Sequence, residues 1–225
     1  MRQPAARLAN VHEPPVIRGG LAARLTSLVL GLFLCACGIV AFLQAGLGLP
    51  PWDVLHQGIA DQTPLSFGEA NLVVSVVVLG IAALARARIG LGTVLNAVLI
   101  GTFVIALTSL DAVDELADAS LSGRIALMLI ALPLFGIGSA LYIAPDLGAG
   151  PRDSLMLVLS KRLAVRIGVS RTGLELAALL LGWALGGTVG IGTLVFALGI
   201  GPAVELSFRV LARTPLVAPA VASPA

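Results

Sequence analysis

Long apolar runs constrain this chain more than any other feature of its sequence. Only 12% of its 225 residues are charged and 58% are hydrophobic, whereas an ordinary soluble domain has about 25% charged residues. A helix of about 20 apolar residues crosses a hydrocarbon core about 30 Å thick, and several runs approach that length. We expect spans at 25–46, 69–86, 91–110, 125–144, 172–187 and 190–208. The sequence therefore predicts an all-α polytopic membrane protein with six transmembrane helices.

Two shorter segments follow the first and the fourth of these spans. Residues 51–62 and 151–163 are too polar and too short to cross the membrane, because 12 residues make a helix only about 18 Å long. They are either helices that lie at the membrane interface or re-entrant half-helices whose N-termini point into the protein. The sequence leaves both interpretations open.

The basic residues predict the orientation of the spans, because Lys and Arg accumulate in cytoplasmic loops. With a cytoplasmic N-terminus, thirteen of the fourteen basic residues fall on the cytoplasmic side, and only Arg124 is external. The C-terminus is then also cytoplasmic, and the acidic segment at 111–120 is external. We expect a multi-pass protein of the bacterial plasma membrane with both ends in the cytoplasm.

The ends of the chain differ from its apolar centre. Residues 1–22 are rich in Arg and Pro, so we expect a flexible cytoplasmic tail. A cleavable signal peptide is the alternative, but the first apolar run is too long for a signal core and lacks an A-x-A site. The Ala- and Pro-rich residues 213–225 are expected to be disordered. Between these tails we expect a first membrane repeat at 23–113, an acidic external linker at 114–123 and a second membrane repeat at 124–212.

The two halves of the chain are related by an offset of 100 residues. Aligning 24–101 with 124–201 needs no gap and gives 17 identities in 78 columns. The identities cluster where LGLPPWDVL meets LGAGPRDSL and where GLGTVLNAVLIG meets GIGTLVFALGIG. Because each half holds three spans, the second half must enter the membrane from the opposite side. This predicts a 3+3 inverted-topology repeat, which is a plan found among transporters.

The repeated phrases also resemble a known family. The L-G-x-x-P-x-D-x-L phrase after the first span of each half, with a later G-x-G-T phrase, is similar to the YczE group of the YczE/YyaS/YitT bacterial integral membrane proteins. The resemblance covers about residues 22–210 and implies a bacterial plasma membrane. It supplies no assigned activity. The soluble C-terminal domain typical of YitT relatives has no counterpart here, so no ligand-sensing role is implied.

Small and rigid residues recur at equivalent positions of the two halves. Gly permits a sharp turn, Pro is tolerated in the first turn of a helix, and small residues let membrane helices approach closely. We assign this structural role to Gly48, Pro51, Gly148, Pro151, Gly90, Gly92, Thr93, Gly190, Gly192 and Thr193. The G-x-G-T stretch is not a nucleotide loop, because it lacks the strand and the Lys or acidic partner that such loops need.

Asp53 and Asp153 occupy the same column of the repeat, early in the two short segments. An aspartate in the first turn complements the positive end of a helix, which is sufficient to explain both if the segments are interfacial. If the segments are re-entrant, both carboxylates face a polar cavity or an ion path. They are then the leading substrate-binding candidates.

Two more substrate-binding candidates lie beside these aspartates. His56 is one turn from Asp53 and can share a proton with it, because histidine titrates near neutrality. An exposed histidine at the interface is the simpler interpretation, and we favour it. Arg152 can pair with Asp153 or bind anionic lipid, while Trp52, in the same column as Arg152, is expected to anchor at the level of the headgroups.

Other polar side chains within the apolar runs have a structural explanation as well as a functional one. Asn96 either bonds to a neighbouring helix, which we favour, or lines a substrate path. Glu69 and Glu175 each stand three residues after a hydroxyl, which predicts capping boxes in preference to substrate binding. Glu205 and Arg209 are spaced i, i+4 and predict an ion pair.

The sequence gives no sign of catalysis. It has no zinc-ligand cluster, no serine elbow and no paired catalytic carboxylates, so we expect no enzyme activity, no cofactor and no metal. Cys35 and Cys37 point away from each other in one helix, so we expect no disulfide between them.

We favour a permease-like transporter of an unknown small solute or ion. A non-transporting membrane scaffold or regulator, which binds another membrane protein through Gly-rich helix faces, is the main alternative, and a lipid-handling role is a weaker one. The expected partners are membrane lipid, a small solute or ion, and a second copy or another membrane protein. Nucleic acid is not expected, since the net charge is only +2.

Overall fold

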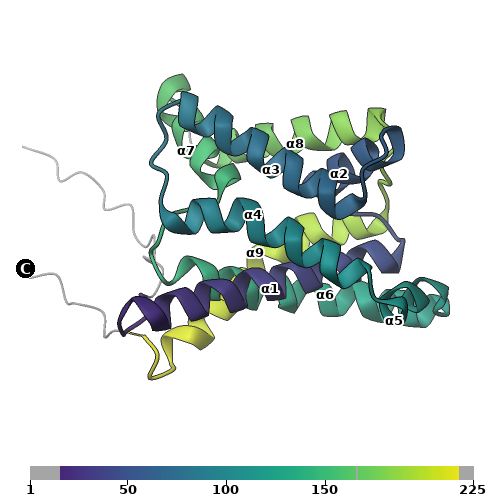
Figure 1. The fold of residues 1–225 in the computed structure, drawn as a ribbon, viewed down its shortest axis with the longest axis horizontal. Helices are drawn as coiled ribbons and strands as arrows, with labels where there is room; N and C mark the ends of the chain where they lie inside the picture. Colours follow the sequence, from purple (N-terminus) through teal and green to yellow (C-terminus); the bar gives the residue numbers. More distant parts are fainter. Residues whose placement is uncertain (1–15, 166, 218–225) are drawn as a thin grey trace, which may run out of the picture.

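A computed structural model describes residues 16–165 and 167–217 (Figure 1). Within these residues, helices are the regular structure, and a single isolated bridge joins Ile17 to Val217. The helices are, in order, α1 (Leu21–Ala45), α2 (Pro51–Gln62), α3 (Phe67–Leu84), α4 (Leu91–Thr108), α5 (Asp111–Asp114), the 3-10 helix η1 (Glu115–Asp118), α6 (Leu121–Ile143), α7 (Pro151–Leu163), α8 (Ile167–Ala184) and α9 (Ile191–Ala212).

Five of the described helices are long and apolar enough to cross a membrane, namely α1, α3, α4, α6 and α9. They correspond to five of the six predicted spans. The remaining prediction, 172–187, overlaps α8, in which Thr172–Ala184 is a shorter apolar helix among the described residues. At 1.5 Å per residue this part is about 20 Å long, which is shorter than a hydrocarbon core.

The short helices α2 and α7 begin where the repeated phrases predict. In each, a proline occupies the first helical position, where its missing N–H leaves no backbone donor unsatisfied. A glycine three residues earlier reverses the chain: φ is +108° at Gly48 and +118° at Gly148. Residues with a Cβ rarely adopt this conformation. The two loops therefore turn in the same way and start the two helices in the same way.

Helices α1 and α6 pack antiparallel along most of their length (Figure 1). They approach so closely at Gly31 and Gly138 that a Cβ on either glycine would lie 2.6–2.7 Å from the backbone oxygen of the other. At one end Arg24 donates to the carbonyls of Pro145 and Asp146. At the other end Arg124 makes the equivalent contacts with Ala45 and Gly46. Arg124, the one external basic residue of the orientation prediction, thus caps the carbonyl end of α1.

The turns that follow α1 and α6 each rest on the start of a helix from the other half. The N–H of Gly192 in α9 donates to Leu47 O at 2.8 Å, and the N–H of Gly92 in α4 donates to Leu147 O at the same distance. Both helices start with an N–H···Oγ1 bond from glycine to threonine, from Gly90 to Thr93 and from Gly190 to Thr193. These glycines permit close contact, as predicted: a Cβ on Gly90 would lie 2.2 Å from Leu147 O.

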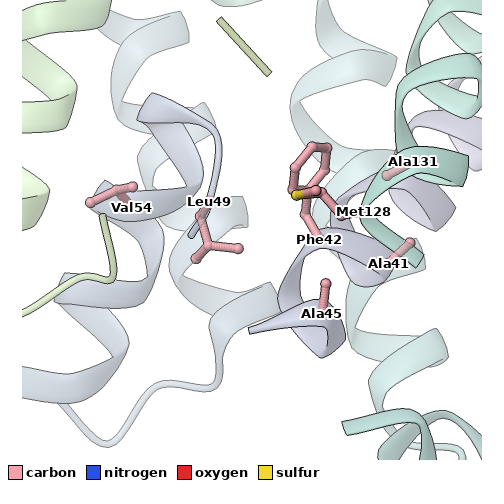
Figure 2. Close-up of a cluster of buried hydrophobic side chains, with 7 residues drawn as sticks. All are labelled: Ala41, Phe42, Ala45, Leu49, Val54, Met128 and Ala131. Carbon is pink, nitrogen blue, oxygen red and sulfur yellow. The ribbon is translucent and has the colours of Figure 1, made fainter. Parts of the chain in front are cut away.

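An apolar cluster fixes the end of α1 and the start of α2 against α6. Figure 2 shows the seven buried side chains, which are Ala41, Phe42, Ala45, Leu49, Val54, Met128 and Ala131. The ring of Phe42 contacts the rings of Phe135 in α6 and Phe196 in α9, with centroids 6.2 and 5.8 Å apart. Aromatic packing therefore joins both halves beneath the loop that enters α2.

The capping prediction is right for one helix and wrong for another. Ser66 and Glu69 form a reciprocal capping box at the start of α3. Helix α8 instead begins at Ile167, so Thr172 and Glu175 are helix-interior residues and form no cap. The sequence pattern misplaced the start of α8 because the preceding residues are also helical. The predicted ion pair between Glu205 and Arg209 is present, and both side chains are exposed.

The described parts of the two predicted tails contact each other and the end of α6. Ile17 is buried, and its N–H donates to Ala144 O, while the N–H of Arg18 donates to Leu216 O. Residues 1–15 and 218–225, which make up most of the predicted tails, lie outside the described residues. The predicted linker at 114–123 contains η1 and the beginning of α6.

Candidate functional site

Helices α2 and α7 lie between α3 and α8 with their N-termini facing each other. The C-terminal end of α2 lies at the end of α8, where Gln62 donates to Leu185 O. The C-terminal end of α7 lies at the end of α3, where Arg162 donates to Ala85 O. Figure 1 shows α2 and α7 toward opposite sides of the molecule. Their first turns meet between these ends, since the Arg152 guanidinium lies 4.7 Å from the centroid of the Trp52 ring.

A cavity of about 170 Å³ lies at this meeting point. Four of the five predicted substrate-binding residues line it: Asp53, Arg152, Asp153 and Asn96. Both aspartates thus reach one space, although they lie 100 positions apart in the chain. The start of α2 is buried at Pro51 and Asp53, so Asp53 faces the interior of the protein.

Many residues that line the cavity occupy equivalent positions in the two halves of the chain. Eight pairs of its lining residues are separated by 100 positions. The pairs are Cys35 and Phe135, Ile39 and Ser139, Pro50 and Gly150, Trp52 and Arg152, Asp53 and Asp153, Ser75 and Glu175, Asn96 and Phe196, and Ile100 and Ile200. Equivalent positions of the two halves therefore surround one space, and most of these positions carry different chemistry in the two halves.

The fifth candidate, His56, lies immediately behind the cavity wall. It is 0% exposed, so the expectation of an exposed interfacial histidine is wrong. Its Nδ1 lies 3.0 Å from Asp53 Oδ1 and 3.0 Å from the side-chain amide of Asn71 in α3. Its Nε2 lies 3.3 Å from a terminal nitrogen of Arg152. The predicted contact with Asp53 is present because the two residues share one face of α2, and that face turns inward.

These contacts determine the tautomer of His56. Arg152 carries donors only, so the Nε2 atom that it contacts must be the acceptor, and the proton of the neutral ring is on Nδ1. The Nδ1–H group then donates to Asp53. The Asn71 amide fits this assignment when its oxygen faces the ring, because the opposite orientation leaves its buried Oδ1 without a partner. Neutral His56 thus links a carboxylate to a guanidinium.

Arg152 and Trp52 contribute to the cavity wall. The sequence predicted a lipid contact or a pairing with Asp153 for Arg152, and a headgroup anchor for Trp52. In the structure the guanidinium stacks on the Trp52 ring and contacts His56. Trp52 also packs against the buried cluster of Val74 and Leu155. The contact between Arg152 and Trp52 forms because the first turns of α2 and α7 meet each other.

The second aspartate has a different partner from the first. Asp153 Oδ2 accepts a hydrogen bond of 3.2 Å from the hydroxyl of Tyr142, close to the end of α6. Asn96 lies beside the start of α7, since a Cβ on Gly150 would lie 3.4 Å from its side-chain atoms. The two halves therefore present an Asp–His pair on one side of the cavity and an Asp–Tyr pair on the other.

Burial sets the charge states of the two basic groups. It lowers the pKa of His56 below its ordinary value, and the hydrogen bond to Asp53 opposes this effect. The pKa of Arg152 is also lowered by burial, while the carboxylates of Asp53 and Asp153 raise it. Arginine starts from so high a pKa that it stays charged. At neutral pH the site therefore combines a neutral histidine with a guanidinium.

Several residues of the site were not identified as candidates from the sequence. Asn71 is fully buried against His56, and its position as an amide inside an apolar run is a signal that was available. Tyr142 gives no such signal, because a tyrosine near the end of a span is ordinary. Glu175 was assigned to a cap and lines the cavity instead.

Within the described part of the chain, no three His, Cys, Asp or Glu side chains converge as a metal site.

Comparison with known proteins places this chain in a family. A family model described as "Family of unknown function (DUF6198)" matches residues 22–209. An uncharacterized protein of Haemophilus influenzae is 39% identical over 188 residues, which cover 84% of each chain. The membrane protein YczE of Bacillus subtilis is 31% identical over 185 residues, which cover 80% of this chain and 83% of YczE. This chain belongs to the YczE family of membrane proteins.

YyaS of Bacillus subtilis also belongs among the relatives of this YczE-family protein. It is 29% identical over 173 residues, which cover 74% of this chain and 83% of YyaS. No solved structure matches the chain. The resemblance inferred from the two L-G-x-x-P-x-D-x-L phrases is confirmed, and the protein is an integral membrane protein.

Proposed function

We propose that this YczE-family protein is a permease-like transporter of a small solute or ion. The observation that carries the proposal is the single cavity that Asp53 and Asp153 share at the facing N-termini of α2 and α7. Discontinuous helices whose termini meet at a binding site are a recurrent feature of secondary transporters. The cavity of about 170 Å³ is larger than the space that one water molecule needs, which suits a small substrate.

In this proposal the two halves form a 3+3 inverted-topology repeat around the cavity. Arg24 and Arg124 make equivalent contacts with the other half, as do Gly92 and Gly192, and these contacts support it together with the paired cavity lining. Helices α2 and α7 are its two re-entrant half-helices, α8 completes the sixth span, and the halves rock about the cavity. This mechanism is inferred by analogy with the architecture of transporters, because one fold can serve many functions.

The proposed location is a bacterial plasma membrane, with both chain ends in the cytoplasm. Positions 87 and 163 then lie on the same cytoplasmic side, and position 117 lies outside. Single cysteines placed there, in a chain that lacks Cys35 and Cys37, report this orientation through their labelling by a membrane-impermeant maleimide. Labelling of positions 87 and 163 from opposite compartments contradicts the inverted repeat.

The scaffold alternative has less support from the described residues. It requires that the Gly-rich faces of α4 and α9 be free to bind a partner. Instead Gly90, Gly92, Gly190 and Gly192 are packed against the backbone of the loops after α6 and α1. Close packing inside the protein accounts for these four glycines, whereas Gly201 of α9 has open space around it.

A flux assay in liposomes tests the proposal. Purified protein is reconstituted, and electrical and radiotracer measurements follow amino acids, amines, carboxylates and alkali cations, while trapped pyranine follows protons. We expect at least one solute to move faster than in protein-free liposomes. Asp53→Asn and Asp153→Asn should each lower that flux at least about tenfold, which corresponds to about 1.4 kcal/mol of lost interaction.

Glu205→Gln is the matched control, because it makes the same carboxylate-to-amide change at an exposed residue outside the cavity. Its flux should stay within about twofold of the wild type. A wild-type protein that moves no solute of the panel contradicts transport. Unchanged flux in both aspartate variants removes the carboxylates from the mechanism.

A further inference from the structure

We propose that the Asp53–His56 pair is a proton-binding site, and that a proton there displaces Arg152 from His56 and so couples transport to a proton gradient. This inference rests on the proposed transport function and adds the coupling ion to it. The two ring nitrogens of one fully buried histidine contact a carboxylate and a guanidinium.

Only the neutral ring can hold both partners. Nε2 accepts from Arg152 while it carries no proton, and Nδ1–H donates to Asp53. A proton that binds to His56 must bind Nε2, since Nδ1 already carries one. The imidazolium then has no acceptor for Arg152, and two positive groups 3.3 Å apart repel each other. Proton binding and the contact with Arg152 are therefore mutually exclusive.

The other groups around His56 do not change this competition. Asp53 on the same helix stabilises the imidazolium, and Asn71 from α3 is neutral and hydrogen-bonds in either state. The Phe67 ring, at the start of α3, packs edge-on against the imidazole with centroids 6.0 Å apart. From α7 the group that faces His56 is Arg152. The charge that a proton must compete with is therefore the guanidinium.

The displaced guanidinium has other partners at hand. Asp153 is the next residue of α7 and lines the same cavity, as does Glu175 of α8. When Arg152 turns toward these groups, it breaks two contacts with α2, the bond to His56 and the stacking on Trp52. Those contacts join the first turn of α7 to the first two turns of α2. Their loss would allow the halves to separate, which is the movement that alternating access requires.

The proton site is present in one half only. The position of the second half that corresponds to His56 carries Met156, which does not titrate, and the position that corresponds to Arg152 carries Trp52. His56 therefore binds one proton per protein molecule in competition with Arg152. Burial lowers the pKa of His56, so the proton binds on the acidic side of neutrality.

The fluorescence of Trp52 can report the displacement. The chain has two tryptophans, Trp52 and Trp183, and two histidines, His12 and His56. In a background of Trp183→Phe with His12→Gln, Trp52 is the remaining tryptophan and His56 the remaining histidine. We expect the Trp52 emission of this protein in lipid nanodiscs to change in a one-proton transition with a midpoint below about 6.5, the ordinary histidine value.

Substitutions at two further positions, His56 and Arg152, test the two parts of the inference in that background. His56→Gln keeps an acceptor for Arg152 and a donor for Asp53 but binds no proton, so the transition should disappear; His56→Met, which copies the other half, is the second variant if His56→Gln does not fold. Arg152→Gln removes the competitor, so the midpoint should rise and the amplitude should fall. A transition that survives in the His56 variants, or that is unchanged in Arg152→Gln, overturns the inference.

The flux assay distinguishes failure of this inference from failure of the transport function. The solute found there should accumulate when a pH gradient is imposed and should stop accumulating in His56→Gln. Solute flux that ignores the pH gradient overturns proton coupling and leaves transport intact. A normal Trp52 transition in a protein that moves none of the panel solutes overturns transport, and with it the coupling.

Discussion

The first turns of α2 and α7 share one backbone design and carry different side chains. Each follows a glycine with positive φ, starts on proline and has an aspartate at the third position. Around that aspartate, α2 has a tryptophan and a histidine, whereas α7 has Arg152 and Met156. The comparison separates the residues that place a half-helix from the residues that decide what its end can bind.

The same distinction extends through both halves. Columns with the same residue in each half, such as Arg24 with Arg124 and Gly48 with Gly148, contact main-chain atoms. Of the eight column pairs that line the cavity, six differ in residue type. Backbone contacts at close range accept few residue types, while a cavity wall accepts many. Symmetry in this protein therefore belongs to the framework, and asymmetry belongs to the cavity.

The largest effect is expected for two single variants, Gly48→Ala and Gly148→Ala, which test whether the two turns are equivalent. A Cβ at Gly48 would lie 2.5 Å from the backbone nitrogen of Gly190, and one at Gly148 would lie 2.7 Å from Thr93 Oγ1. Left-handed strain of about 1–2 kcal/mol adds to overpacking of about 1–3 kcal/mol. Both variants should lose most of their monodisperse yield in fluorescence-detected size exclusion. Gly80→Ala, with open space around it, should lose none.

A smaller and equal effect is expected for Arg24→Gln and Arg124→Gln. Each change removes charged donors from two carbonyls at the end of a partner helix. Hydrogen bonds to charged groups contribute about 1.5–3 kcal/mol, so each variant should lower the free energy of unfolding in SDS by about 2 kcal/mol. Arg209→Gln, which breaks an exposed pair, should cost less than about 1 kcal/mol. Strongly unequal losses at Arg24 and Arg124 would break the symmetry of the framework.

The smallest expected change in the free energy of unfolding concerns the helix starts at Ser66 and Thr172, where the two halves differ. Ser66→Ala removes one side of the capping box of α3 and should cost about 1 kcal/mol in the same SDS titration. Thr172→Ala changes an exposed helix-interior residue of α8 and should stay within about 0.5 kcal/mol. A loss at Thr172 as large as that at Ser66 would restore the cap that the sequence predicted there.

Sequence patterns correctly predicted the features that depend only on interactions between nearby residues. The boundaries of α2 and α7, the cap at Ser66 and the pair of Glu205 with Arg209 depend on neighbours within four residues, and all are present. The same kind of reasoning failed at Glu175, where the pattern fits a cap but the helix starts earlier. It also failed for the exposure of His56, because burial depends on which helices cover a face.

The sequence by itself determined that this chain is a helical membrane protein of the YczE family, with two short helices that begin alike in its two halves. Hydrophobic run length, Gly and Pro geometry and the 100-residue offset carry that information along the chain. Only the tertiary structure decided that those helices point their N-termini at one cavity, and that Arg152 reaches His56 across it. Such contacts join residues 96 positions apart, and their geometry depends on how all the surrounding helices pack.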